Sequence, residues 1–313
     1  VDATAQATVI LGGKPLVLKI AAPRGCGKTG DPDVPMESLV GAIKNADAWI
    51  EYNNEWIFYS TTYDRIIEDP DHSPRYLNLC GANPDLIVRN IRKVDNVMLA
   101  EFITAIDAYT KAGKHFRVTT PAGTDVEFDN APNREYATAD GFVRKGEIKM
   151  FPGQISWAPE FDSINGVIVV DGTLTPPFGR VVNTPIKLTI EKGYITKIDG
   201  EGSDVAEYAA WLKAFNDPNM YLCAHISYGF GPNAKLSGDI VEDERVWGST
   251  EWGFGNVGPQ LVSDIPGGIP ASSHSDGVCL NSSVWLDGVQ ILDKGAIVGP
   301  TPEIIALARK LGK

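Results

Sequence analysis

The fold of this 313-residue sequence is decided by two stretches, NMYLCAHISYGFG at residues 219–231 and SSHSDGVCLNSSVWLDG at residues 272–288. The first contains aromatic and β-branched residues that are typical of a strand, and the second has this character at its far end. Side chains two residues apart in a strand point to the same face of the sheet. We therefore expect the His274 imidazole and the Asp276 carboxylate to converge on one point. His225 occupies one face of the other strand.

Two imidazoles and one carboxylate can occupy one face of a metal ion and leave three coordination positions open. Such a ligand set without thiolate suits Fe(II) or Mn(II), and Zn(II) is a competitor. The residues also have an ordinary interpretation. A His-x-Asp pair on a strand is often only hydrogen-bonded, and a single histidine is often structural. The spacing alone leaves both interpretations open.

The segment between these stretches adds a turn and a group of aromatic residues. Gly229–Asp239 is rich in glycine and asparagine and is expected to line a cleft. Glu251 could be a further metal ligand, an anchor for a ligating histidine, or an acid–base group. A solvent-facing glutamate is the alternative. Its aromatic neighbours could flank a planar substrate or belong to the core, and they are Trp247, Trp252 and Phe254.

The remaining two histidines differ in their surroundings. His72 lies in a turn set by Pro70 and Pro74. A histidine in a loop titrates near neutral pH, so His72 is the candidate general base, with an exposed histidine of no function as the alternative. His115 begins a predicted strand beside Lys114, and we assign it no function.

The region up to residue 120 alternates between short apolar runs and helical periodicity, which predicts an α/β domain. A long amphipathic helix is expected over Asp85–Ala112, with Gly113 as its stop signal. The predicted strands of this region are Leu16–Pro23, Ala48–Tyr52, Glu55–Thr61 and Arg75–Gly81.

From Thr120 onward, glycine and proline become frequent and short strands follow one another, including a hairpin that turns at Lys192-Gly193. One helix interrupts the strands, with Ser203 or Asp204 as its cap. The sequence thus predicts an N-terminal α/β domain at residues 1–120, followed by a strand-rich α+β metal-binding domain at residues 121–313.

Composition excludes several functions. The formal net charge is −12, from 40 acidic and 28 basic residues, which disfavours nucleic-acid binding and attachment to an anionic membrane surface. No apolar run approaches the roughly 18 residues of a membrane helix. The four cysteines are widely spaced without a Cys-x-x-Cys pair, so we expect reduced thiols and a cytoplasmic protein.

Several motifs over Thr120–Gly295 resemble the aminopeptidase-T-like metallopeptidase fold in order and spacing. They are TPAGTDVEFD, FPGQISWAPE, GVIVVDGTL, CAHISYGFGPNAKLSGDIVEDERVWGSTEWGFGN and SSHSDGVCLNSSVWLDG. The peptidases hold two metal ions with glutamates at the positions of Gln154 and His225 and with a histidine at the position of Glu251. Only His274 and Asp276 keep the peptidase identity. An amide in place of a carboxylate lowers the negative charge, which makes a two-cation cluster hard to hold.

With histidine at position 225, the pattern is similar to the 2,5-dihydroxypyridine 5,6-dioxygenase family on this fold. The resemblance implies His225, His274 and Asp276 as ligands of one Fe(II), and a histidine from the N-terminal region as base, for which His72 is the candidate. The expected activity is ring opening of a hydroxylated aromatic substrate with O2. The alternative is a metal-dependent hydrolase on the same scaffold, which would consume no oxygen. Relatives imply at least a dimer.

Overall fold

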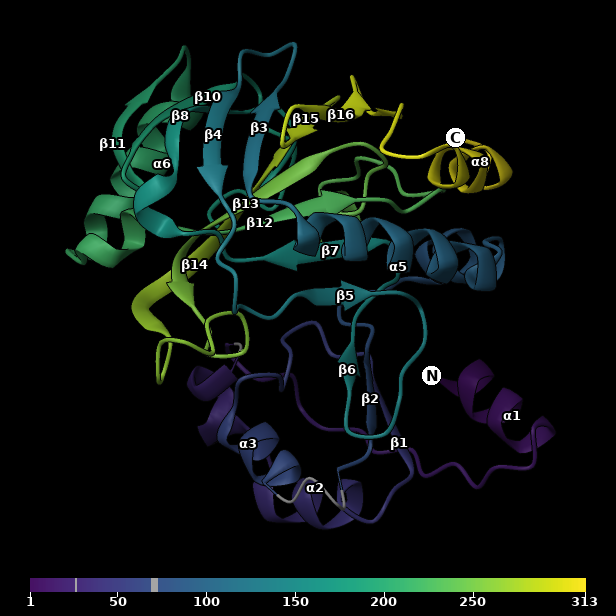
Figure 1. Ribbon diagram of the computed structural model, residues 1–313. Helices are drawn as coiled ribbons and strands as arrows, with labels where there is room; N and C mark the ends of the chain where they lie inside the picture. Colours follow the sequence, from purple (N-terminus) through teal and green to yellow (C-terminus); the bar gives the residue numbers. More distant parts are fainter. Residues whose placement is uncertain (26, 69–72) are drawn as a thin grey trace. The chain divides into compact units, whose positions relative to one another are not determined.

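The computed structural model describes residues 1–25, 27–68 and 73–313 (Figure 1). These residues form two compact units. Unit 1 comprises Val1–Asn83 and Phe142–Met150, and unit 2 comprises Pro84–Gly141 and Phe151–Lys313. The predicted boundary near residue 120 therefore differs from the division of the structure. The long helix and the strand that follows it belong to unit 2.

Unit 1 contains a parallel three-stranded sheet with the order β1-β2-β6. Its small core is formed by side chains of α2 and α3 with Ile57, and Ile20 packs against this core. The elements are α1 (Asp2–Ile10), η1 (Gly27–Asp33), α2 (Met36–Ile43), β1 (Ala48–Glu51), α3 (Thr61–Ile67), β2 (Arg75–Asn78) and β6 (Ile148–Lys149).

Two of the four strands predicted for this region are confirmed, as β1 and β2. The other two predictions are wrong. Leu16–Pro23 forms no strand, and Glu55–Thr61 leads into α3, whose first turn is capped when Ser60 Oγ accepts the Tyr63 N–H at 3.1 Å. Short apolar runs become strands only where a neighbouring strand can pair with them, and the local pattern does not report that neighbour.

The predicted helix Asp85–Ala112 is interrupted at Asp95. The chain forms α4 (Pro84–Ile87), a π-helical turn η3 (Val88–Arg92) and then α5 (Asn96–Ala112). Asp95 starts α5 by accepting the Met98 N–H at 3.0 Å, as an N-cap does. The apolar periodicity of the sequence continues across the break, so the sequence pattern does not indicate it.

Unit 2 is built around an eight-stranded sheet with the order β11-β10-β8-β4-β3-β15-β16-β17 and a six-stranded sheet with the order β5-β7-β12-β13-β14-β9. The predicted hairpin is confirmed as β10–β11. The strands are β3 (His115–Thr119), β4 (Asp125–Asp129), β5 (Ala137–Ala139), β7 (Gln154–Trp157), β8 (Asn165–Val170), β9 (Leu174–Thr175), β10 (Ile186–Glu191), β11 (Tyr194–Asp199), β12 (Cys223–Gly229), β13 (Thr250–Val257), β14 (Ile269–Cys279), β15 (Ser283–Leu286), β16 (Val289–Asp293) and β17 (Ala296–Ile297).

The helical elements that accompany these sheets are η4 (Phe161–Ser163), α6 (Ser203–Ala214), η5 (Pro218–Tyr221), α7 (Ile240–Asp243) and α8 (Pro302–Lys310). One large hydrophobic core joins α5, both sheets, α6 and α8. The central strand β12 is almost entirely buried, so its side chains face packed surfaces on both sides. Within the described ranges, no helix has the length and apolar character needed to cross a membrane.

Asp204 is buried and anchors the start of α6, although not as the predicted cap. Its carboxylate accepts hydrogen bonds from the Arg180 guanidinium at 2.9 and 3.0 Å and from the Asn183 backbone N–H at 2.7 Å. The hydrogen bonds from Arg180 lower the pKa of Asp204 strongly, against the opposing effect of burial.

A group whose pKa is depressed on folding stabilises the protein above its unfolded pKa, near 3.9 for aspartate, and this contribution is lost as the pH falls through the folded pKa. We therefore expect Asp204→Asn to lower the free energy of unfolding by about 2 kcal/mol at pH 7. The difference from wild type should shrink below about pH 4. Urea unfolding from pH 7 to pH 2.5 measures this, and a difference that does not change with pH would contradict it.

Candidate metal centre

Three adjacent strands of the six-stranded sheet position the predicted ligands. The register places His225 of β12 and Asp276 of β14 on either side of Gly253 of β13, and His274 beside Gly255. Because Gly253 has no side chain, the predicted ligands His225 and Asp276 can converge over the middle strand. A Cβ atom on Gly253 would lie 2.2 Å from Cε1 and Nδ1 of His225, well inside van der Waals contact.

The ligand atoms of His225, His274 and Asp276 all lie within 4.8 Å of one another. The Asp276 Oδ1 atom is 3.0 Å from His274 Nε2 and 3.7 Å from His225 Nε2. The two imidazole rings are nearly parallel, at 9°, with centroids 5.2 Å apart. Among the residues that the structure describes, these three are the histidine, cysteine or acidic side chains grouped closely enough to hold one ion.

The hydrogen bonds of the site fit a bound cation. His274 donates its Nδ1–H to the Asn256 carbonyl oxygen at 2.8 Å, so Nε2 is the nitrogen that a bound cation would take once it has displaced the proton shared with Asp276. Burial lowers the pKa of His225, against the opposing charges of Asp276 and Glu244, so its imidazole is neutral as a ligand requires. Burial acts to raise the pKa of Asp276, but the charge and hydrogen bond of His274 outweigh it and keep the carboxylate ionised.

Glu251 lies in the same site and is fully buried. Its Oε2 atom is 3.2 Å from His225 Nε2, whereas Oε1 has no hydrogen-bond partner among the described residues. Burial, reinforced by the charge of Asp276, raises the pKa of Glu251 well above its usual range. The alternative prediction, that Glu251 faces solvent, is therefore wrong. A buried carboxylate oxygen without a donor is the environment in which a nearby cation is stabilising.

The aromatic residues around Glu251 lie on the opposite face of β13. Trp252 and Phe254 are fully buried in the core, as strand alternation requires when Glu251 and Gly253 face the metal site. Trp247 stacks on Phe102 with ring centroids 5.2 Å apart. The structure thus supports the interpretation of these rings as core residues rather than as walls for a substrate.

A second acid, Glu244, is partly buried close to the predicted ligands and was not identified from the sequence. The Glu244 Oε2 atom accepts hydrogen bonds from Gln154 Nε2 at 2.7 Å and from Arg245 Nη1 at 3.0 Å. Burial raises the pKa of Glu244 to about 7; Arg245 opposes this shift, and the charges of Asp276 and Glu251 add to it. The contact between Gln154 and Glu244 joins residues 90 positions apart, so only the fold could reveal it.

The other two histidines are His72 and His115. His72, the predicted general base, lies outside the described residues. His115 is half-exposed and pairs with Asp129 at 2.8 Å at the surface of the eight-stranded sheet.

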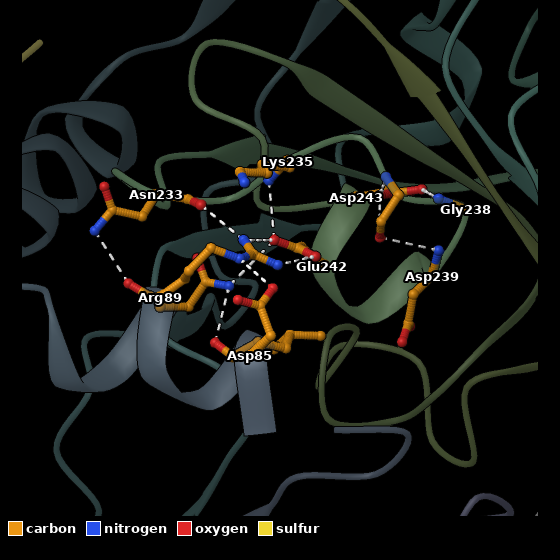
Figure 2. A network of polar contacts seen from close by, with 11 residues as sticks. Asp85, Arg89, Asn233, Lys235, Gly238, Asp239, Glu242 and Asp243 are labelled. Carbon is orange, nitrogen blue, oxygen red and sulfur yellow. Dashed lines mark hydrogen bonds and ion pairs between the residues drawn. The ribbon is translucent and has the colours of Figure 1, made fainter. Parts of the chain in front are cut away.

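The segment that carries Glu244 is fastened to η3 by the polar network of Figure 2. The Arg89 guanidinium binds both carboxylate oxygens of Glu242, with one contact at 3.0 Å, and donates to the Asn233 carbonyl oxygen at 2.9 Å. Glu242 also accepts the Lys235 backbone N–H at 3.0 Å. Glu242 is buried, so its ion pair with Arg89 is shielded from water. The contacts to Asn233 and Glu242 hold the segment 233–242 against η3.

We expect Arg89→Ala to lower the free energy of unfolding by about 2–3 kcal/mol, because removal of one partner leaves the Glu242 carboxylate buried with fewer donors. Arg117→Ala is the matched control. It removes an exposed pair with Asp125 and should cost less than about 1 kcal/mol. Guanidinium unfolding of both variants tests this, and equal losses would show that burial of the Arg89 pair does not matter.

The fold and the site together define an α/β chain in which two histidines and one aspartate lie close enough to hold a metal ion. The model of the NicX family, described as 2,5-dihydroxypyridine 5,6-dioxygenase, matches residues 1–299. The chain belongs to this family.

Known relatives agree with this assignment. The chain is 27% identical over 234 residues to the 2,5-dihydroxypyridine 5,6-dioxygenase of Pseudomonas putida, an alignment that covers 69% of this chain and 63% of that protein, slightly less than two thirds. The structure of 2,5-dihydroxypyridine dioxygenase from Pseudomonas putida is similar, with a TM-score of 0.78 and 21% identity over 97% of this chain and 88% of the other.

Wild-type AmpT from Thermus thermophilus is also similar, with a TM-score of 0.56 and 14% identity over 84% of this chain and 79% of that chain. At these identities the two solved structures establish the fold. The prediction of an α/β protein with the aminopeptidase-T-like fold is confirmed.

Proposed function

We propose that this chain is an Fe(II)-dependent dioxygenase that opens the ring of a hydroxylated N-heteroaromatic compound such as 2,5-dihydroxypyridine. The observation that carries the proposal is the convergence of His225, His274 and Asp276 in a member of the NicX family. A donor set without thiolate suits iron, and three ligands leave room for substrate and O2.

The residues of the chain have distinct roles in this proposal. His225, His274 and Asp276 hold the iron, and Asn256 keeps the His274 ring in its ligating orientation. When bound, iron supplies the redox chemistry by which both atoms of O2 are incorporated as the ring opens. Glu251 orients His225 and balances charge. His72 accepts a proton from a substrate hydroxyl group.

A metal-dependent hydrolase is the second candidate, favoured by the similarity in fold to AmpT. In that case the metal would activate water for attack on an amide. Gln154 weighs against a two-metal version, since its amide is committed to Glu244 and brings no negative charge to the site.

The two candidates are separated by oxygen uptake. Protein loaded anaerobically with Fe(II), Mn(II) or Zn(II) is mixed with 2,5-dihydroxypyridine, and ring absorbance and dissolved oxygen are followed together. We expect one O2 consumed per ring lost with Fe(II) alone. Cleavage of an aminoacyl amide without oxygen uptake would establish the hydrolase instead. Retention of the ring under all three loadings would refute 2,5-dihydroxypyridine as the substrate.

We also propose a homo-oligomeric, cytoplasmic enzyme with a small aromatic substrate and O2 as its partners. The buried cysteines Cys223 and Cys279 remain thiols, in agreement with a reducing location.

A further inference from the structure

The first part of unit 1 exposes an unusual amount of apolar surface. Helix α1 buries none of its side chains. Seven large apolar residues are exposed between residues 1 and 18, several of them more than two thirds exposed. They are Val1 (54%), Val9 (59%), Ile10 (84%), Leu11 (86%), Leu16 (71%), Val17 (41%) and Leu18 (48%). We call residues 1–22 the arm.

The second half of the arm is an extended segment without backbone partners. Residues 14–22 belong to no helix or strand, and their N–H and C=O groups form no hydrogen bonds with the described residues. The sequence LVLKI at residues 16–20 is nevertheless typical of a strand. Apolar, strand-forming backbone with free hydrogen-bonding groups is a template for pairing with another chain.

The arm touches the rest of unit 1 at few points. Thr4 Oγ1 lies 2.7 Å from Tyr52 Oη, just beyond the end of β1, and Ile20 packs against the small core. Figure 1 draws α1 apart from α2 and α3 of the same unit. These anchors fix the arm without covering its apolar side chains.

The exposed area matches what a specific interface needs. The seven side chains expose on the order of 800 Å² in total, which is about the area that each partner contributes to a standard protein interface. Monomers rarely expose an apolar patch of more than a few hundred Å². The arm therefore has the area of one half of an interface.

Unit 1 also carries a surface that can receive such a segment. β1 pairs with β2 on one side and is an edge strand, with Ile50 38% exposed. The arm from Leu11 to Ala22 contains two lysines and no acid, whereas the whole chain has a net charge of −12. A donor segment and an open acceptor edge in one unit are self-complementary, which is the requirement of a two-fold symmetric dimer.

We propose that the arm of one chain docks on unit 1 of a second copy, with residues 16–20 pairing along the edge of β1, and that the exchange is reciprocal. Two copies related by a two-fold axis then bury the exposed apolar side chains of both arms. The backbone N–H and C=O groups of residues 16–20 find hydrogen-bond partners in both copies. This inference is independent of the proposed catalytic function.

The association is tested by sedimentation of the full chain across concentrations. We expect a dimer, or an assembly of dimers, at micromolar concentration, and at least 100-fold weaker association in Leu16→Asp. Val97→Asp is the matched control, since it places the same charge on an exposed apolar residue of α5 and should associate like wild type. A wild-type chain that is monomeric at all concentrations overturns the proposal, as does unchanged association of Leu16→Asp.

Hydrogen exchange of the wild type gives a readout that needs no variant. Backbone amides of residues 16–20 and of the outer edge of β1 should be protected at high protein concentration and should exchange rapidly on dilution. A dimer in which these amides exchange freely at every concentration overturns the strand pairing. A monomer that sediments with anionic phospholipid vesicles would assign the arm to a lipid surface and overturn the proposal as well.

Discussion

His225→Ala is expected to abolish stoichiometric metal binding and to lower ring-opening activity by more than about 100-fold. Loss of a residue that only supports a metal ligand costs 10- to 100-fold in affinity or activity, so loss of a ligand should cost more. We expect a large effect because the two candidate ligands that remain, His274 and Asp276, both come from one strand, β14.

Metal content after gel filtration is the primary measurement, because it does not depend on the substrate, and turnover is the second. His115→Ala serves as the control, since His115 is half-exposed and lies in the other sheet of unit 2. We expect it to keep both metal and activity. A His225→Ala protein that retains one equivalent of iron would remove His225 from the ligand set.

Gly253→Ala is expected to weaken metal binding by at least about 100-fold, although the substitution replaces no predicted ligand. The added Cβ would overlap the His225 ring at 2.2 Å, so either the ring turns away or β12 and β13 move apart. Displacement of the ring is comparable to loss of the ligand.

The measurements are titration of the apoprotein with Fe(II) or Zn(II) and thermal unfolding without metal. Gly41→Ala is the control, because a Cβ at Gly41 meets no atom within 4 Å. It should bind metal normally and be slightly more stable. Normal metal affinity in Gly253→Ala would show that the sheet has room for the methyl group and that Gly253 has no positioning role.

The centre could be predicted from the sequence to the extent that it depends on strand alternation. His274 and Asp276 are two residues apart, so their convergence follows from the geometry of one strand. The position of His225 depends on how β12 pairs with β13 and β14. The resemblance to a family indicated that pairing, and the structure brings the three side chains together.

Features that depend on long-range contacts could not be predicted in this way. The hydrogen bond of Glu244 to Gln154 joins β7 to the end of α7. Its formation requires β7 and the end of α7 to lie side by side. The burial of Glu251 likewise comes from neighbouring strands, because the local sequence is equally suitable for an exposed glutamate.

In the N-terminal region, the sequence predicts a strand that the structure does not form. Residues 16–20 have the composition of a strand, yet a strand needs a partner, and within a single chain none is present among the described residues. The prediction was wrong for the isolated chain. The division into units also differs from the predicted boundary, because α5 packs against β5, β7 and α8.

The contact between His225 and Glu251 suggests how the same fold could bind a different number of metal ions. In the peptidase pattern, the imidazole and the carboxylate occupy these same two positions in reverse order. Since β12 and β13 are neighbours, such a swap moves each group by one strand and leaves the electrical balance of the pocket unaltered. The remaining difference in charge is the amide of Gln154. If this chain holds one ion as proposed, that neutral amide is the change in charge that accompanies the loss of the second.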